Sequence, residues 1–539
     1  MHTAIRSVLA YSLIVLLLSS AASAQSRQAP PGMFKGLDDE LLGDALILHG
    51  RQLFIDDYVI EELHGARKTL NQPVKHPANP LVVKDQSWEE SGPGYSTVLY
   101  DAEAKLFKMW YGFWIKNAKP SEQVLCYATS QDGFRWEKPV INREAGNNVV
   151  APPRVKGFQC AGIFRDPVER DPQRRYKMLF SAAPDGTEKS WSTSAAYSPD
   201  GLRWTEQAGD PPIPFSDTQI CPYWDSQRQR YVAILRYGPP NTRIVSRIES
   251  EDFVQWSPKV TVLRLSRMDR PLATQFYQMA PFGYADHSFG LIAAYHNESL
   301  KPITEAAPWT DRKNLHLAYS RDGLTWSRVG QHGAIPAREL NQDRDWKQIA
   351  LDAVFLPYGE RDKEWDWGTI SPIYTPEPII VGDEIRFYYI GINAKNWWTW
   401  SGDPPKLDPN PTEPGIGIGL ATLRLDGFVS VNAGGDAGTL TTKPLVFLGD
   451  TLVVNANAAG GSLTVEALDA EGKVIEGFGA ADCTPITTDS VRHVLKWKDN
   501  PDCHLLQGRP IKLRFHLKNA NLYAFEPRIK HNHYLQSYD

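Results

Sequence analysis

The heptapeptide Ser130-Gln131-Asp132-Gly133-Phe134-Arg135-Trp136 decides the fold, because related heptapeptides recur along the chain. Segments 198–204 and 320–326 keep the serine, the Asp-Gly pair and the tryptophan, while 250–256 lacks the glycine and 425–428 is a weaker fifth copy. Asp-Gly favours a tight turn, and the aspartate side chain accepts hydrogen bonds from nearby backbone N–H groups. We therefore expect each copy to be a turn between strands, with the tryptophan covering the gap between neighbouring sheets.

The spacing of the copies indicates their architecture. Their aspartates stand at positions 132, 200, 252, 322 and 426, so successive copies are 68, 52, 70 and 104 residues apart. This spacing fits four-stranded sheets with variable loops, and it exceeds the 20–50 residues of solenoid repeats. Alternating or aromatic-rich strand pairs precede the copies. The sequence predicts an all-β fold, with a five-bladed β-propeller over residues 45–427.

The composition changes after residue 427. Aromatic residues become rarer, and segments 439–455, 461–475 and 511–517 alternate between apolar and polar residues. That alternation is typical of antiparallel strands with one buried face. We predict a separate C-terminal β-sandwich over residues 428–530, which we expect to brace the propeller, with sugar binding as the alternative.

The N-terminal segment resembles a secretory signal peptide. It has a positive residue, Arg6, an apolar run over 8–18 and the small-residue site Ala22-Ser23-Ala24. The run is shorter than the roughly 20 residues that span a bilayer. We expect residues 1–24 to be removed and the protein to be exported, to the periplasm or the medium, without an integral membrane span. A retained N-terminal anchor is the alternative.

Charge, motifs and cysteines narrow the function. The chain has 58 Lys and Arg against 63 Asp and Glu and no basic cluster in sequence, which argues against a nucleic-acid partner. HExxH, P-loop and GxSxG motifs do not occur, which excludes three common enzyme classes at the level of motifs. The chain contains no CxxC pair, the motif that would suggest a zinc site, and we expect no metal or cofactor. Cys483 and Cys503 are the pair most expected to form a disulfide.

Several features together resemble a known family. They are the repeated turns, Asn79-Pro80 before the first blade, the run Phe164-Arg165-Asp166-Pro167 and the trailing sandwich. The chain resembles the five-bladed glycoside hydrolases of the invertase and fructosidase type, family 32, and their arabinanase and mannoside-phosphorylase relatives. The resemblance implies that Asp166 binds sugar hydroxyls and steadies the transition state, with Arg165 beside it.

Two motifs of that family are missing. The Trp-Met-Asn-Asp-Pro motif of the nucleophile is absent, and Ile220 stands where the Glu-Cys motif would place its general acid. Asp217, three residues earlier, is the nearest carboxylate to that position. These departures argue against the cleavage of fructosides.

Position along the predicted blades adds further candidates. Glu90 precedes the first blade and is a candidate catalytic carboxylate, with Trp88 beside it as a candidate sugar contact. Asp366 and Glu377, near the start of the fifth blade, and Trp398, in an aromatic and proline-rich loop, are candidates for substrate binding. Each has a structural alternative, such as a solvated loop charge for Glu90 and a packed plug for Trp398.

The sequence favours an exported glycoside hydrolase that cleaves a plant- or algal-type oligo- or polysaccharide. Paired carboxylates at the propeller axis, drawn from Asp166, Asp217 and Glu90, would carry out the acid–base chemistry. One alternative is a glycan-binding propeller without catalysis. Another is a sialidase-like hydrolase with six blades, which would need a triad of arginines to hold a carboxylate sugar.

Overall fold

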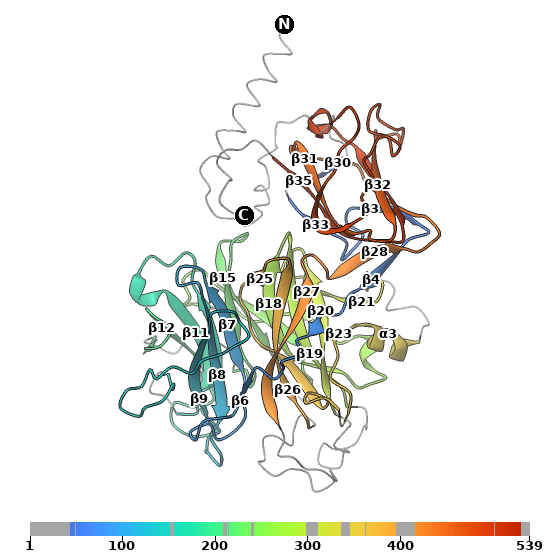
Figure 1. The fold of residues 1–539 in the computed structure, drawn as a ribbon. Coiled ribbons are helices and arrows are strands. Elements are labelled where there is room, and N and C mark those ends of the chain that lie inside the picture. The colour runs from blue at the N-terminus through green and yellow to red at the C-terminus, as the bar shows by residue number, and fades with distance from the viewer. Residues whose placement is uncertain are drawn as a thin grey trace. The chain divides into compact units, whose positions relative to one another are not determined.

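The computed structural model describes residues 44–48, 50–150, 156–207, 213, 215–238, 242–297, 311–335, 345–361, 363–394, 415–500 and 502–529. The chain divides into two compact units, Lys68–Ser430 and a unit made of Met1–Arg67 with Val431–Asp539. Strands dominate both units (Figure 1). The helical elements of the described residues are short: α3 (Trp346–Asp352) and the 3-10 turns η1 (Pro172–Arg174), η2 (Arg267–Asp269) and η4 (His504–Leu506).

The unit Lys68–Ser430 is built from five consecutive antiparallel blades. The first blade consists of β7 (Ser96–Asp101), β8 (Leu106–Trp114) and β9 (Gln123–Ser130). The second consists of β10 (Gln159–Arg165), β11 (Tyr176–Ala182), β12 (Ser192–Ser198) and β13 (Thr205–Glu206). The third consists of β14 (Cys221–Asp225), β15 (Arg230–Arg236), β16 (Val245–Ser250) and β17 (Val260–Leu263). The fourth blade has β18 (Gln275–Tyr284), β19 (His287–Tyr295) and β20 (Lys313–Ser320), with β21 (Ser327–Gly330), β22 (Gly333–Ala334) and β23 (Val354–Leu356) outside them. The fifth has β24 (Thr369–Pro372), β25 (Ile379–Val381), β26 (Glu384–Ile392) and β27 (Ile416–Arg424).

The five blades close into a ring. The first strands of successive blades contact one another, from β7 through β10, β14 and β18 to β24. Tyr374, just after β24, then pairs with Thr97 of β7. The fifth blade is completed by β5 (Val74–Lys75) and β6 (Val82–Val83), which precede the first blade in sequence. The predicted five-bladed propeller is confirmed, and the ring does not fit the six blades of the sialidase-like alternative.

The first strands β10 and β14 run side by side in the same direction. Ile220, just before β14, donates its backbone N–H to the carbonyl oxygen of Cys160 near the start of β10 (3.4 Å). At the other end of β10, Asp166 contacts Tyr231, whose strand partner is Trp224 near the end of β14. We call the end of the propeller where the first strands begin the start end, and the opposite end the finish end.

The repeated heptapeptides form the expected turns, and each follows the third strand of its blade. Asp132 accepts hydrogen bonds from the backbone N–H groups of Phe134 and Arg135, both at 2.8 Å, and Asp200, Asp252 and Asp322 repeat this geometry. Ser130 accepts from the N–H of Gly133 (2.8 Å), which has a positive φ of 77°. These residues are therefore structural.

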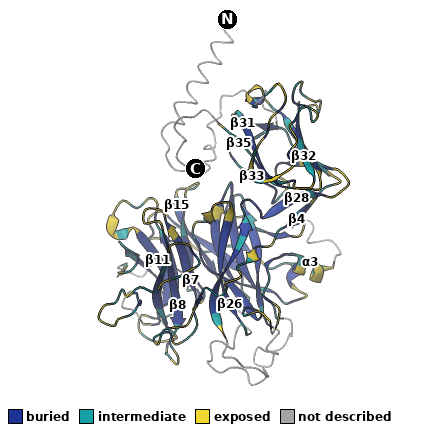
Figure 2. Ribbon diagram, in the orientation of Figure 1, coloured by how far each residue is buried: buried dark blue, intermediate teal, exposed yellow. Residues whose placement is uncertain are grey.

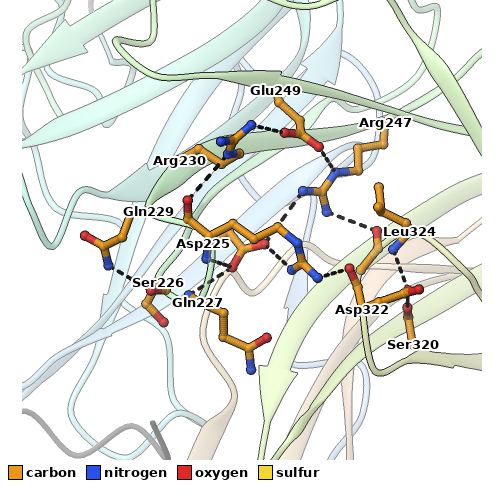
Figure 3. Close-up of polar contacts among 12 residues, drawn as sticks. Asp225, Ser226, Gln227, Gln229, Arg230, Arg247, Glu249, Ser320, Asp322 and Leu324 are labelled. Atoms are coloured by element: carbon orange, nitrogen blue, oxygen red, sulfur yellow. Dashed lines mark hydrogen bonds and ion pairs between the residues drawn. The ribbon is translucent and has the colours of Figure 1, made fainter. Parts of the chain in front are cut away.

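The turns also join neighbouring blades. Side chains of the preceding blade donate to the carbonyl oxygen of the turn glycine, in three pairs: Tyr388 to Gly133 (2.9 Å), Trp110 to Gly201 (2.6 Å) and Arg247 to Gly323 (3.0 Å). Figure 3 shows Arg247 fixed by Glu249 next to the turn of Asp322. In the copy without glycine, Phe253 takes a φ of 64° and packs against Phe164 of the preceding blade, with ring centroids 5.9 Å apart.

The hydrophobic core of the propeller lies between adjacent blades. The strands are largely buried, as the dark blue ribbons of β7, β8, β11 and β26 show (Figure 2). Trp110 and Phe180 belong to the cluster between the first two blades, and Val232 and Ile292 to the one between the third and fourth. The apolar core therefore consists of separate layers between adjacent blades. The two ends of the propeller axis lie outside these layers, so polar residues can occupy them.

The other unit is a β-sandwich. One sheet contains β2 (Gln52–Leu53), β4 (Arg67–Leu70), β28 (Val429–Ala433), β31 (Thr451–Asn457), β33 (Asp489–Val494) and β35 (Ala520–Arg528), and the other contains β3 (Ile60–His64), β29 (Gly438–Thr442), β32 (Ser462–Leu468) and β34 (Lys512–Lys518). A short parallel pair joins β1 (Leu46–Ile47) to β30 (Leu445–Val446). Residues of both sheets, such as Phe515 and Phe525, share one apolar core.

The unit boundaries differ from those expected from the sequence. The propeller unit begins at Lys68 instead of residue 45, and the sandwich resumes at Val431 instead of residue 428. The cause is strand pairing, because β1, β2 and β3 all pair with strands of the C-terminal part. Residues 45–67 lack the repeated turn, and no other sequence pattern separates them from the first blade.

The predicted disulfide is not formed. Cys483 and Cys503 are both buried with free thiols: Cys483 Sγ accepts from the N–H of Val465 (3.4 Å), and Cys503 Sγ donates to the carbonyl of Gly449 (3.7 Å). The 20-residue spacing did not reveal that each thiol has its own backbone partner. The predicted signal peptide lies outside the described residues, among which no helix has the length and apolar character needed to cross a membrane.

Candidate functional site

The structure separates the two aspartates that were expected to face each other. Asp166 follows β10 and lies at the finish end, whereas Asp217 precedes β14 and lies at the start end. At about 3.3 Å per residue, a seven-residue strand puts roughly 20 Å between its ends. Asp166 and Asp217 therefore do not form a catalytic pair, and this expectation is corrected.

Asp166 belongs to a buried ion network instead. Its carboxylate accepts from the ammonium of Lys177 (2.5 Å) and from the hydroxyl of Tyr231 (2.7 Å), and Lys177 also contacts Glu169 (3.0 Å). The side chains of Asp166 and Lys177 are 0% and 1% exposed, so neither is open to a ligand. The Phe-Arg-Asp-Pro run lies at the end of its strand, and its aspartate braces the second blade against the third.

Two other candidates lie at the finish end. Arg165, at the end of β10, pairs with Glu103 (2.6 Å). Glu377 lies between β24 and β25, where burial raises its pKa although nearby Arg165 acts in the opposite direction. The structure places both residues apart from Asp217, so they do not share one site with it.

The candidates near the first and fifth blades have mixed outcomes. Glu90 is exposed at the start end and accepts from the backbone N–H of Lys116, which follows β8 (2.8 Å). Trp88 packs against the core of the first blade and donates to Asn148 (3.0 Å). Asp366 is fully buried, where it pairs with Lys75 (2.7 Å). Trp398 lies outside the described residues.

The start end carries a group of residues that the sequence did not single out. Arg236 ends β15, Arg243 precedes β16 and Lys313 begins β20, so all three belong to strand ends on this side. They surround the ring of Tyr277, in β18, with the charged groups of Arg236, Arg243 and Lys313 at 4.5, 5.6 and 4.1 Å from the ring centroid. Asp217 forms an ion pair with Arg236. We call these five residues the basic cluster.

The charges of the basic cluster are not balanced. Asp217 is its only carboxylate, and its side chain is 61% exposed. Arg236 and Lys313 are buried, with 9% and 4% of their surfaces exposed. Two like charges about 8 Å apart repel by about 2 kcal/mol at an effective dielectric constant near 20. Burial and the two arginines together lower the pKa of Lys313 to about 7, and burial also lowers the pKa of Arg243.

Lys313 differs from the other buried lysines. Its ammonium makes no hydrogen bond or ion pair with any described residue, and its contact is the face of Tyr277. Buried cations are normally paired, because an unpaired buried charge is costly. The ammonium of Lys313 is therefore available to a ligand.

Further polar atoms without partners lie at the same end. Tyr95 Oη, Gln123 Nε2 and Thr369 Oγ1 are buried without a hydrogen-bond partner, and all three residues lie at or next to the start of a strand. Gln278 Oε1, a few residues into β18, is also unpartnered. Such atoms are rare in native proteins, and a bound water or ligand is one way in which they are satisfied. The start end is thus the candidate functional site.

Aromatic rings lie on the same side of the propeller. Trp191, just before β12, stacks on Phe215, two residues before Asp217, with ring centroids 5.4 Å apart. Both rings are half-buried. Partly exposed aromatic rings offer apolar faces to a ligand that is otherwise polar.

No family model matches the sequence, and no curated protein is significantly similar to it. Solved structures with a similar fold include an N-acetylgalactosamine deacetylase from F. plautii (14% identity, 68% of this chain and 97% of that chain, TM-score 0.42). A β-1,2-mannobiose phosphorylase from Listeria innocua is 12% identical over 65% of this chain and 96% of its own, with a TM-score of 0.41. A GH32 β-fructofuranosidase from Bombyx mori is 12% identical over 86% of this chain and 93% of its own, with a TM-score of 0.37. These structures are glycan-processing enzymes, but at such scores they carry no argument about chemistry.

Proposed function

We propose that this protein binds a glycan at the start end of the propeller and cleaves it there. The observation that carries the proposal is the set of buried, unpartnered polar atoms on Tyr95, Gln123, Gln278 and Thr369. Amide and hydroxyl groups suit sugar hydroxyls, which both donate and accept hydrogen bonds. The half-buried stack of Trp191 on Phe215 supplies an aromatic surface at the same end.

Asp217 is the carboxylate that we propose acts on the bound glycan. It is exposed, it precedes the first strand of the third blade, and Arg236 fixes its orientation. Glu90, exposed at the same end, is the proposed second carboxylate. Glycosidases use such pairs, one as acid and the other as base or nucleophile. Export of the mature protein remains part of this proposal.

A second function is favoured by one observation. Among the residues that the structure describes, no second carboxylate contacts the basic cluster. A propeller that only binds its glycan would have this composition, because binding does not require an acid–base pair.

Asp217→Asn separates the two functions. The full chain is titrated calorimetrically with a panel of oligosaccharides, and release of reducing ends is measured on those that bind. If Asp217 is catalytic, the variant keeps its affinity within a few-fold and loses at least about 100-fold in turnover, the usual contribution of an acid–base group.

Glu103→Gln is the matched control for that experiment, because Glu103 is an exposed carboxylate that pairs with Arg165 at the finish end. We expect the control to turn over like the parent. Binding without reducing-end release by the parent chain would support the binding-only function. Full turnover by Asp217→Asn would remove Asp217 from the mechanism.

A further inference from the structure

We propose that the basic cluster is a binding site for an oxyanion, foremost the carboxylate of an acidic sugar, so that the substrate is an acidic glycan. This inference rests on the proposed function, because it names the class of glycan that the start end selects. Inorganic phosphate shares the same chemistry, and the experiment below distinguishes it from the acidic sugar.

The first argument is a comparison with the other buried cations of the propeller. Buried Arg386 donates to the backbone carbonyl oxygen of Asp132. Three other buried cations pair with a carboxylate: Lys177 with Asp166 (2.5 Å), Arg328 with Asp269 (2.7 Å) and Arg247 with Glu249 (3.0 Å). Lys313 has none among the described residues, although it is 4% exposed. These four buried cations each have a polar partner, whereas the ammonium of Lys313 has neither a hydrogen bond nor an ion pair with a described residue.

The second argument is the geometry of the three cations. All three lie within 6 Å of the centroid of the Tyr277 ring, although they come from three different strand ends. Guanidinium groups bind carboxylates through paired N–H donors, and an ammonium adds a point charge. Arg243 donates from Nη1 to Gln275 (2.7 Å), which fixes the guanidinium in place.

The third argument is the position of the cluster beside atoms that suit neutral sugar groups. Tyr95 Oη is buried without a hydrogen-bond partner. Burial is the main cause that raises the pKa of Tyr95, and the neighbouring Tyr277 raises it further. Asp217, the proposed catalytic carboxylate, pairs with Arg236 of the cluster. An acidic sugar bound here would place its carboxylate on the cluster and its hydroxyls near Tyr95.

Calorimetric titration with matched ligands tests the inference. The probes are trigalacturonic acid, its fully methyl-esterified form, which has the same sugar chain without the negative charges, and inorganic phosphate. The acid should bind at least ten-fold more tightly than the ester. Lys313→Met and Arg243→Met should each weaken binding of the acid at least ten-fold and leave binding of the ester unchanged. Arg203→Met, which removes an exposed arginine of a repeated turn, is the control and should bind like the parent.

The pH dependence of binding gives a second readout. The charged and titratable groups around Lys313 are Arg236 of β15, Arg243 just before β16 and Tyr277 of β18. Asp217 joins them through its ion pair with Arg236. Since its pKa is about 7, Lys313 loses its charge as the pH rises through neutrality. A bound oxyanion stabilises the protonated ammonium of Lys313, so the affinity for the acid should fall between about pH 6 and pH 8. Near about pH 7.5, binding of the acid should be accompanied by uptake of a proton by Lys313.

Lys313→Arg should remove this pH dependence, because arginine stays charged throughout this range. The outcomes separate the two proposals. Equal binding of acid and ester, unaffected by Lys313→Met and Arg243→Met, would overturn the oxyanion site and leave the proposed function standing. Absence of binding by every saccharide and by phosphate would overturn both. Phosphate binding that depends on Lys313 would support the oxyanion site and identify free phosphate as its source.

Discussion

Asp166→Asn is expected to lower the free energy of unfolding by about 3 kcal/mol, the lower end of the cost of breaking a buried ion pair. The substitution leaves the ammonium of Lys177, 1% exposed, with Glu169 and Tyr231 but without its closest anion. Chemical denaturation followed by tryptophan fluorescence measures the change. The effect should appear as a lower midpoint with an unchanged slope.

The double variant Asp166→Asn with Lys177→Met is the informative control. Because it removes both charges, it should recover part of the lost stability. Glu103→Gln, which alters an exposed ion pair nearby, should change the unfolding free energy by less than about 1 kcal/mol. A stable Asp166→Asn protein that had lost its activity would contradict the structural role of Asp166 between the second and third blades. It would return Asp166 to the catalytic site.

Gly162→Ala is expected to prevent folding, or to cost more than about 3 kcal/mol, the upper range for overpacking. Gly162 lies in β10, and a β-carbon there would be 1.7 Å from the carbonyl oxygen of Ile220 and 2.9 Å from its carbonyl carbon. Both are backbone atoms of the next blade, so relief requires the first strands β10 and β14 to separate. Soluble yield and the thermal unfolding midpoint measure the effect.

Gly283→Ala is the matched control, because Gly283 also lies in a first strand, β18, but an added β-carbon meets nothing within 4 Å. Its midpoint should stay near that of the parent, or rise slightly through the lower entropy of the unfolded chain. Equal midpoints for the two variants would show that the first strands do not pack as closely as described.

The repeated turn made the fold predictable from the sequence. Its serine and aspartate accept hydrogen bonds from nearby backbone N–H groups, and its glycine takes the positive φ of the turn, so the pattern keeps its meaning without knowledge of the rest of the chain. The unit boundary was not predictable in this way. The pairing of β3 with β29 joins residues such as His64 and Thr439, which are 375 positions apart, and no local pattern encodes it.

The site was harder to predict, for two physical reasons. The Phe-Arg-Asp-Pro run suggested Asp166, but a strand has two ends, and the run occupies the end away from Asp217. Arg236, Arg243 and Lys313 belong to no sequence motif. They come together because each of them contacts the ring of Tyr277. The available signal was weak: Arg236 ends the apolar run 231–235, but Lys313 begins a strand in which polar and apolar residues are equally frequent, although that strand is largely buried.

A crystal structure of the full chain with trigalacturonic acid bound tests the central claim most directly. The account predicts a sugar carboxylate about 3 Å from the ammonium of Lys313 and the guanidinium of Arg243, with Asp217 beside the sugar ring. A ligand bound at the finish end beside Arg165 and Glu377, or on the sandwich, with the basic cluster unoccupied, would contradict it.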